Sequence, residues 1–263
     1  MSELEIINSN DTLQAINKAE IDTQIATAKQ YPRDINRVLS TIKTLASMDE
    51  ETAEECFYAL KRGYGSNQTL IEGLSVRMAE IFASSWGNLR VATRIVGNDG
   101  KTITAQGICH DLETNVAISV NVDRRITTKD GRTFSEDMQV VTGNAASAIA
   151  FRNAIFKVIP KAVTRKVVEE IKQIALGKTN DLEKKREAMV KWYNSQTVTT
   201  EEILSYIEAK SVEDINLEML LTLRATAQAI KEGTTTIAET FHQKESIPEK
   251  KKVLKSKGPV KLL

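Results

Sequence analysis

The spacing of apolar residues along the chain changes twice, and each change predicts a change of secondary structure. From residue 34 to about residue 84, apolar residues recur every three or four positions, as in amphipathic helices. Across residues 89–137 the period is two, which is typical of β-strands. From about Gly143 to Ala175 the helical period returns, with an interruption at Pro160. The pattern predicts an α+β fold in which an antiparallel β-meander packs on a long basic helix, with helical N-terminal elements and a small C-terminal three-helix module.

Three helices are expected before the strands. The first spans residues 34–46. The second follows Ser47 and Glu50, which fit a capping box, and runs to about Leu60. The segment "KRGYGSNQ" is rich in Gly and Asn and predicts a loop, after which a third helix spans about residues 72–84.

The meander is expected to contain four strands. The segments "LRVATRIV", "TITAQGICHDL" and "NVAISVNVDRRITT" alternate in polarity, and "RTFSED" follows the turn signal "KDG". One face of the third strand carries Val116, Ile118, Val120 and Val122. This face should pack on the long helix.

Composition divides the chain into four parts. Residues 1–30 form a polar, acidic arm, and residues 31–178 form the predicted core. Residues 198–241 form a small helical module, and residues 242–263, with seven lysines against two glutamates, form a basic tail that we expect to be disordered. Two capping boxes and a stop glycine mark the helices of the module: Thr199 with Glu202, Thr236 with Glu239, and Gly233.

Overall composition is that of a soluble protein. The chain has 263 residues, 41% hydrophobic and 27% charged, with a formal net charge of +1. It has no long uncharged apolar run, and its acidic start does not resemble a signal peptide. Two cysteines are too few for a disulfide framework and predict free thiols in a reducing compartment. We therefore expect a soluble protein of the cytoplasm that does not enter the membrane.

Motifs for common enzyme chemistry are incomplete. The segment "DGKT" lacks the glycine that a phosphate-binding loop needs five residues before Gly100, so a hairpin turn is favoured over ATP binding. In "CHDLE", Cys109 and His110 would lie on opposite faces of a strand, which argues against a zinc site. With two histidines in the chain, a Ser/His/Asp triad is not expected, and no cofactor is predicted.

Two alternatives stay open. The first is a metal-dependent DNA nuclease that would hold Mg²⁺ through its carboxylates, for which the candidates are Asp111, Glu113, Glu136 and Asp137. The second is a structural virion or scaffold protein that oligomerises without a nucleic-acid role.

Positive charge gathers on the segment "FRNAIFKVIPKAVTRKVV", residues 151–168, which contains no acidic residue. On a helical wheel Phe151, Ile155, Val158 and Ala162 form an apolar stripe, and a cationic stripe of Lys157, Lys161 and Arg165 lies about a quarter-turn away. Arg152 flanks the apolar stripe on its other side. A solvated face usually mixes both signs of charge, so this pattern favours contact with a polyanion.

Further cations surround the predicted turns and would form other walls of one groove: Lys61, Arg62, Arg90, Arg94, Arg124, Arg125, Lys129 and Arg132. The alternative interpretation of these residues is protection of strand edges by charge. A groove of this kind would follow a sugar-phosphate backbone with little sequence preference. Aromatic residues make up 5% of the chain, so base stacking should contribute little.

The order of motifs resembles that of the single-strand annealing recombinases, which include the phage RecT, Red-beta and Erf types and the eukaryotic Rad-type annealing proteins. The resemblance lies in "LIEG" before a helix, "WGNLRV" at the start of the meander, "KDGRTFSED" as a hairpin and "AFRNAIFKVIP" in the closing helix. It covers roughly residues 31–177. Asn153 departs from the pattern, because a second basic residue often stands there.

The resemblance implies a homo-oligomeric ring or filament that anneals complementary DNA strands during recombination, in a phage or prophage setting, without nucleotide hydrolysis. It implies a C-terminal module that docks a partner such as the host single-strand binding protein, and it implies a partner exonuclease as a further partner of the protein. Together with the charge pattern, it gives these candidate DNA-binding residues: Arg152, Lys157, Lys161, Arg165, Lys61, Arg62, Arg124, Arg125, Lys129 and Arg132.

Overall fold

The computed structural model describes residues 9–63, 68–128, 130–177 and 181–242. In chain order its elements are α1 (Ser9–Gln30), α2 (Ile35–Ala46), α3 (Glu50–Glu55), β1 (Phe57–Arg62), β2 (Thr69–Leu74), α4 (Val76–Trp86), β3 (Leu89–Asn98), β4 (Thr102–Asp111), β5 (Val116–Arg125), α5 (Glu136–Val158), α6 (Lys161–Leu176), α7 (Leu182–Ser195), α8 (Thr200–Ile207), η3 (Val212–Asp214), α9 (Leu217–Lys231) and α10 (Ile237–Thr240).

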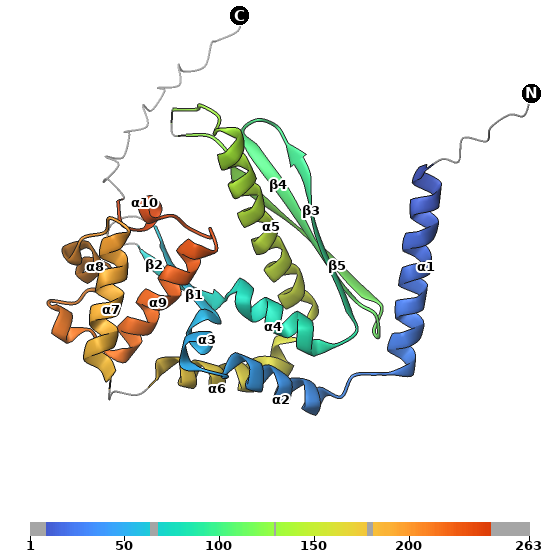
Figure 1. Ribbon diagram of the computed structural model, residues 1–263, viewed down its shortest axis with the longest axis horizontal. Coiled ribbons are helices and arrows are strands. Elements are labelled where there is room, and N and C mark those ends of the chain that lie inside the picture. The colour runs from blue at the N-terminus through green and yellow to red at the C-terminus, as the bar shows by residue number, and fades with distance from the viewer. Residues whose placement is uncertain (1–8, 64–67, 129, 178–180, 243–263) are drawn as a thin grey trace, which may run out of the picture.

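The fold is α+β, as the sequence predicts. It has two antiparallel sheets, a β1–β2 hairpin and a β3–β4–β5 meander. Figure 1 shows the meander packed on α5, with α2, α4 and α6 beneath them and α7–α10 beside the hairpin. The main hydrophobic core lies where α2, α3, α4, α5 and α6 meet β1.

The capping box predicted at Ser47 and Glu50 is wrong. Ser47 instead ends α2, and its backbone amide donates to the carbonyl of Lys43. The N-cap of α3 is Asp49, whose carboxylate accepts from the amide of Thr52 at 2.7 Å. The helix expected to reach residue 60 therefore ends at residue 55.

The β1–β2 hairpin occupies the predicted end of the second helix, the start of the predicted loop 61–68 and the start of the predicted third helix. The residues "FYALKR" of β1 pair with "TLIEGL" of β2, in a register that sets Tyr58 opposite Gly73 and Leu60 opposite Ile71. A short apolar run fits a strand as well as a helix, and here tertiary packing decides between them. The third helix begins only at Val76, behind the N-cap Ser75.

The three long strands of the meander lie where they are predicted. Their register places Val116, Ile118, Val120 and Val122 on the face that packs on α5. The predicted fourth strand is wrong: that segment makes one isolated bridge, Thr127 to Thr133. Helix α5 begins at Glu136, seven residues earlier than expected, because the strand-like segment is short and Ser135 caps the helix.

Small residues allow α5 to lie very close to β4. Ala105 on β4 and Ala146 and Ala150 on α5 are all fully buried and form one cluster. A Cβ atom added to Gly107 would lie 2.2 Å from the carbonyl oxygen of Ala150. This close backbone approach fixes the height of α5 above the sheet.

The predicted interruption at Pro160 is confirmed. Helix α5 ends at Val158, and Pro160 is the N-cap of α6, with both Ile159 and Pro160 in extended backbone conformations. The two helices therefore meet at a corner instead of forming one long helix. Ala162, expected on the apolar stripe, is exposed because the corner resets the helical phase.

The C-terminal helices share a second hydrophobic core. Both predicted capping boxes are present, and Gly233 follows the end of α9 with φ of 69°. Helix α7, which precedes the module predicted at residues 198–241, contributes the buried Tyr193, whose hydroxyl donates to the carbonyl of Leu223. We call residues 182–241 the C-terminal module.

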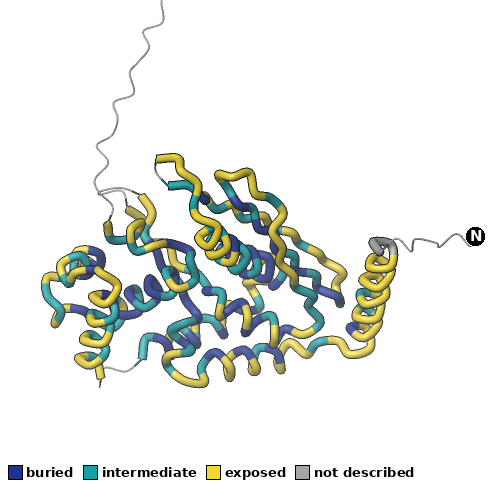
Figure 2. Tube along the Cα trace, turned by 45° about the horizontal axis from the view of Figure 1, so that its top comes forward, coloured by how far each residue is buried: buried dark blue, intermediate teal, exposed yellow. Residues whose placement is uncertain are grey.

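Helix α1 stands apart from the rest of the fold (Figure 1), and most of it is exposed in Figure 2. It contacts the meander through Arg90, whose guanidinium donates to Gln24 at 3.1 Å and lies 4.0 Å from Glu20. Arg90 points away from α5, so α1 lies on the opposite side of the sheet. None of the helices in the described part of the chain combines the length and apolar character that crossing a bilayer requires.

We predict that Gly107→Ala destabilises the protein by about 2 kcal/mol, because the new methyl group overlaps the backbone of α5. Gly97→Ala is the matched control on the neighbouring strand, since its Cβ would lie 3.6 Å from the nearest atom. The measurement is urea unfolding followed by circular dichroism. Equal midpoints for the two variants would show that the close approach of α5 to β4 carries little energy.

Candidate nucleic-acid interface

A cleft of about 480 Å³ lies between the β1–β2 hairpin and the corner formed by α5 and α6. Cations outnumber carboxylates among the charged residues that line it, which are Arg152, Lys161, Arg165, Lys172, Glu72 and Glu169. Three of the predicted DNA-binding residues, Arg152, Lys161 and Arg165, therefore meet in one place. They come from two helices, and the corner at Pro160 brings them together.

Arg152 is the most enclosed cation of the cleft, with a side chain only 8% exposed. Its guanidinium carbon lies 4.4 Å from the centre of the Tyr58 ring, and its Nε donates to the side chain of Asn153 at 3.3 Å. Tyr58 in turn lies against Gly73, where a Cβ atom would come within 2.6 Å of the ring. The glycine thus makes room for the tyrosine, and the tyrosine positions the arginine.

The cations of α6 form the more accessible wall of the cleft. Lys161 and Arg165 are exposed and lie one turn apart. Lys172 continues this wall and lies 3.5 Å from Glu72 on β2. Sequence reasoning missed Lys172, although extending the Lys161–Arg165 stripe along the helix would have found it. It also missed Tyr58, because β1 was expected to be helical.

Four other predicted cations lie outside the cleft. Lys157 is exposed in the last turn of α5, where a positive charge also complements the helix dipole. Arg62 is exposed at the end of β1, and Arg125 is exposed at the end of β5. Arg132 is exposed beyond the meander and lies 3.6 Å from Asp130. A fifth, Lys129, is outside the described residues.

Two further predicted cations contact the C-terminal module. The ammonium of Lys61 lies 3.4 Å from Glu208 and 5.0 Å from the centre of the Tyr206 ring. Arg124 donates to the carbonyls of Gly233 at 2.7 Å and Thr234 at 3.2 Å. These contacts join the module to β1 and β5. No sequence pattern indicated them, since the partners are more than 100 residues away.

Of the four carboxylates proposed for a nuclease site, two are paired with Arg33 and the other two lie far from them. Arg33 donates to both oxygens of Asp111, at 2.5 and 2.8 Å, and to Glu113 at 2.9 Å. Glu136 and Asp137 lie in the first turn of α5, near the end of β3, where Gln139 bonds Asn98. Asp111 lies at the other end of the sheet, roughly 30 Å away along a ten-residue strand. The four carboxylates therefore do not form one metal site.

The pKa values around Arg33 are shifted in a consistent direction. Burial acts to raise the pKa of Asp111, but the hydrogen bonds and charge of Arg33 outweigh it and lower the net value. Burial also acts to raise the pKa of Glu113, but the hydrogen bond from Asn88 and the contacts with Arg33 outweigh it and lower the net value. Both groups are thus held ionised as partners of a buried guanidinium.

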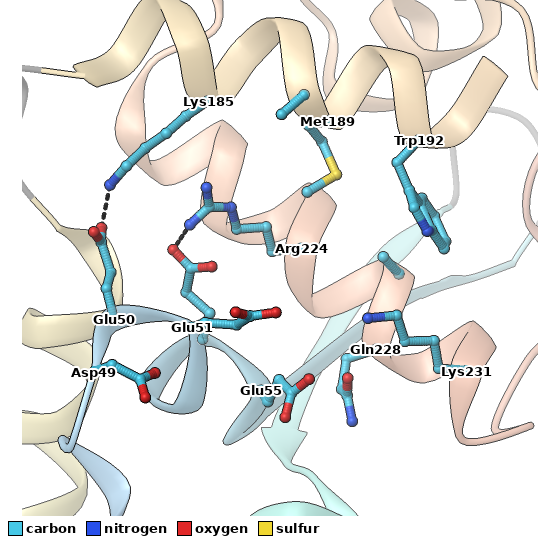
Figure 3. Close-up of a pocket in the computed structure, with 13 residues that line it drawn as sticks. Asp49, Glu50, Glu51, Glu55, Lys185, Met189, Trp192, Arg224, Gln228 and Lys231 are labelled. Atoms are coloured by element: carbon cyan, nitrogen blue, oxygen red, sulfur yellow. Dashed lines mark hydrogen bonds and ion pairs between the residues drawn. The ribbon is translucent and has the colours of Figure 1, made fainter. Parts of the chain in front are cut away.

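A second pocket, of about 550 Å³, lies between α3, α7 and α9 and is drawn in Figure 3. Its acidic residues all come from α3 and its N-cap: Asp49, Glu50, Glu51, Glu54 and Glu55. Lys185 pairs with Glu50, and Arg224 pairs with Glu54, so the pocket is crossed by ion pairs that tie the module to the core. Its excess of carboxylates makes it a poor site for a phosphate backbone.

The predicted free thiols are confirmed, and both are buried. Burial raises the pKa of Cys56 and of Cys109 to about 12, so neither is a nucleophile near neutral pH. As expected, His110 and Cys109 lie on opposite faces of β4. His110 contacts the side chain of Asn115. Within the described residues, no group of three or more His, Cys, Asp or Glu side chains is arranged to hold a metal ion.

Comparisons of the chain with protein-family models, with curated proteins and with solved structures find no match. The functional assignment therefore depends on the geometry of the cleft and on the sequence motifs.

The Arg33 cluster predicts a specific response to acid. Because Asp111 and Glu113 have lower pKa values in the folded protein than in the unfolded chain, their contribution to stability is present near neutral pH. It is lost as pH falls through the acid range. Arg33→Met should destabilise the protein by about 3 kcal/mol at about pH 7, since it leaves a buried carboxylate without its partner.

The same variant should lose less stability than the wild type between about pH 7 and about pH 4, because protonation relieves its unpaired carboxylate. Urea unfolding at the two pH values measures both effects. Arg37→Met, at an exposed position of α2, is the control. If Arg33→Met and Arg37→Met have the same acid response, the cluster is not a stabilising ion pair.

Proposed function

We propose that this chain binds single-stranded DNA along the cleft between the β1–β2 hairpin and α5–α6, and that it accelerates pairing of complementary strands without nucleotide hydrolysis. The observation that carries the proposal is the convergence of Arg152, Lys161, Arg165 and Lys172 on one cleft. A concave surface with an excess of cations attracts a phosphate backbone and releases its counterions. The motif resemblance to single-strand annealing recombinases supports the same function.

The side chains of the cleft favour backbone contact over base stacking. The ring of Tyr58 is bounded by Gly73 and by the guanidinium of Arg152, so its faces are largely occupied. The ring of Phe156 packs edge-on against Phe82 of the core, with centroids 5.5 Å apart. A strand held by its phosphates keeps its bases available for a complementary strand, which is what annealing requires.

The turn at "DGKT" supports independence from nucleotide hydrolysis. The carboxylate of Asp99 accepts from the amides of Lys101 and Thr102, at 2.8 and 2.6 Å. A phosphate-binding loop needs such amides free to contact the nucleotide. In this turn they close a hairpin between β3 and β4 instead.

One chain offers a short binding surface, which supports the expected ring or filament. From Lys161 to Lys172 helix α6 rises about 16 Å, which is long enough to contact only a few phosphates of one strand. A few contacts of this kind bind weakly at physiological salt. Several chains on one DNA strand would raise the overall affinity through multivalency.

We predict that the double variant Lys161→Gln/Arg165→Gln weakens binding to oligothymidylate and lowers the salt dependence of its affinity. The slope of log K against log salt should fall by about 0.7 for each lost phosphate contact. Fluorescence anisotropy across a salt series gives the slope. The rate of pairing of two complementary labelled oligonucleotides, without ATP, should fall in parallel.

The matched control is Lys184→Gln/Lys191→Gln, which removes two positive charges from exposed positions of α7. It should change the slope little. The cleft is not the binding site if the wild-type chain does not bind single-stranded DNA. The same holds if the slope of log K against log salt falls equally in both double variants. Cleavage of the labelled DNA with Mg²⁺ would instead favour the nuclease hypothesis.

A further inference from the structure

The C-terminal module lies on three of the cations predicted to bind DNA. Glu208 lies beside Lys61, Glu232 lies beside Arg152, and the carbonyls of Gly233 and Thr234 accept from Arg124. Figure 1 shows the end of α9 and the segment after it reaching toward α5. Each of these cations thus lies beside a carboxylate or carbonyl group of the same module, although the three lie on different elements of the core.

Glu232 is the central contact. Its side chain is 8% exposed, and one carboxylate oxygen accepts from the amide of Val76, at the first turn of α4, and from Gln228, both at 2.9 Å. The other oxygen lies 4.0 Å from Nη1 of Arg152. Neither of these two atoms has a hydrogen-bond partner among the described residues. The two opposite charges are therefore buried together without a direct hydrogen bond.

The segment after Glu232 fits tightly against α5. Gly233 has φ of 69°, and a Cβ atom added there would lie 2.7 Å from the Cβ of Ala145. Only a residue without a side chain allows this approach at this backbone conformation. The first half of α9 is anchored differently, by Leu221 and Ala225 in the main hydrophobic core. The amides of Gly233 and Thr234 donate to the carbonyls of Ile230 and Ala229, so separation of the segment 232–234 from the core would also move the last turn of α9, while its first half stays packed.

We propose that residues 232–234 form a latch that covers Arg152 and Arg124 in the free protein, and that single-stranded DNA replaces it. This inference rests on the proposed function. Glu232 and Glu208 place negative charge beside Arg152 and Lys61, as phosphates would, and a bound strand must compete with them. The latch lowers the apparent affinity of the closed form and makes release of residues 232–234 part of DNA binding.

The test compares Glu232→Gln with Glu201→Gln in the full-length chain. Glutamine at 232 can still accept from the Val76 amide, so the fold is kept while the attraction to Arg152 is removed. Glu201 is exposed on α8, and its replacement removes the same charge from the same module. We expect Glu232→Gln to bind oligothymidylate severalfold more tightly than the wild type, and Glu201→Gln to bind nearly as the wild type does.

A double-mutant cycle separates the latch from a general charge effect. In an Arg152→Gln background, Glu232→Gln should gain no more affinity than Glu201→Gln does. Gly233→Ala, which forces the segment away from Ala145, should reproduce the gain of Glu232→Gln by a steric route. Circular dichroism verifies that the variants are folded.

Hydrogen exchange at the Val76 amide gives a structural readout, because its acceptor is Glu232. Saturating oligothymidylate should increase exchange at this amide in the wild type. Suppose the chain binds DNA, but Glu232→Gln and Glu201→Gln bind oligothymidylate with the same affinity, and DNA leaves the exchange of the Val76 amide unchanged. In that case the latch is wrong and the proposed function stands. If neither the wild type nor Glu232→Gln binds, the proposed function fails and the latch fails with it.

Discussion

The arrangement of this protein depends on how closely α5 approaches β4. The seam between them is built from glycine and alanine, so its stability comes from tight contact of backbone with backbone more than from large apolar side chains. Once Ala150 faces the sheet, Arg152 lies two residues on, about 200° around the helix, and faces the hairpin and α9. The position of the most enclosed cation of the cleft therefore follows from the packing of a helix on a sheet.

The near-neutral charge of the chain conceals a separation of positive and negative surfaces. Cations gather along the corner of α5 and α6, whereas the carboxylates of α3 and its N-cap line the pocket between the core and the module. Ion pairs such as Arg224 with Glu54 and Lys185 with Glu50 join the two parts. These pairs balance charge within the chain and limit the self-repulsion that would otherwise destabilise the compact state.

The parts of the fold that depend on local pattern could be predicted from the sequence. Strict alternation identified the meander, a proline located the corner between α5 and α6, and capping boxes identified the starts of α8 and α10. The β1–β2 hairpin could not be predicted, since its apolar residues suit helix or strand and its packing against α9 decides the outcome.

The candidate site was predictable in its cations but not in their partners. Charge and helical spacing identified Arg152, Lys161 and Arg165. The acceptors of Lys61 and Arg124 lie 147 and 110 residues away along the chain. The guanidinium that pairs with Asp111 belongs to Arg33, which lies 78 residues away along the chain. Long-range pairing of this kind leaves no periodic signal, so carboxylates that look available in the sequence are already bound in the fold.

The corner at Pro160 has an entropic consequence. The proline ring fixes φ near −65°, and Ile159 and Pro160 both adopt extended conformations between two helices that are packed into the core. The cations on either side of the corner are thus carried by backbone that has little freedom left to lose. For a ligand that bridges Arg152 and Arg165, the ordering of the backbone that carries these two residues is part of folding and not of binding.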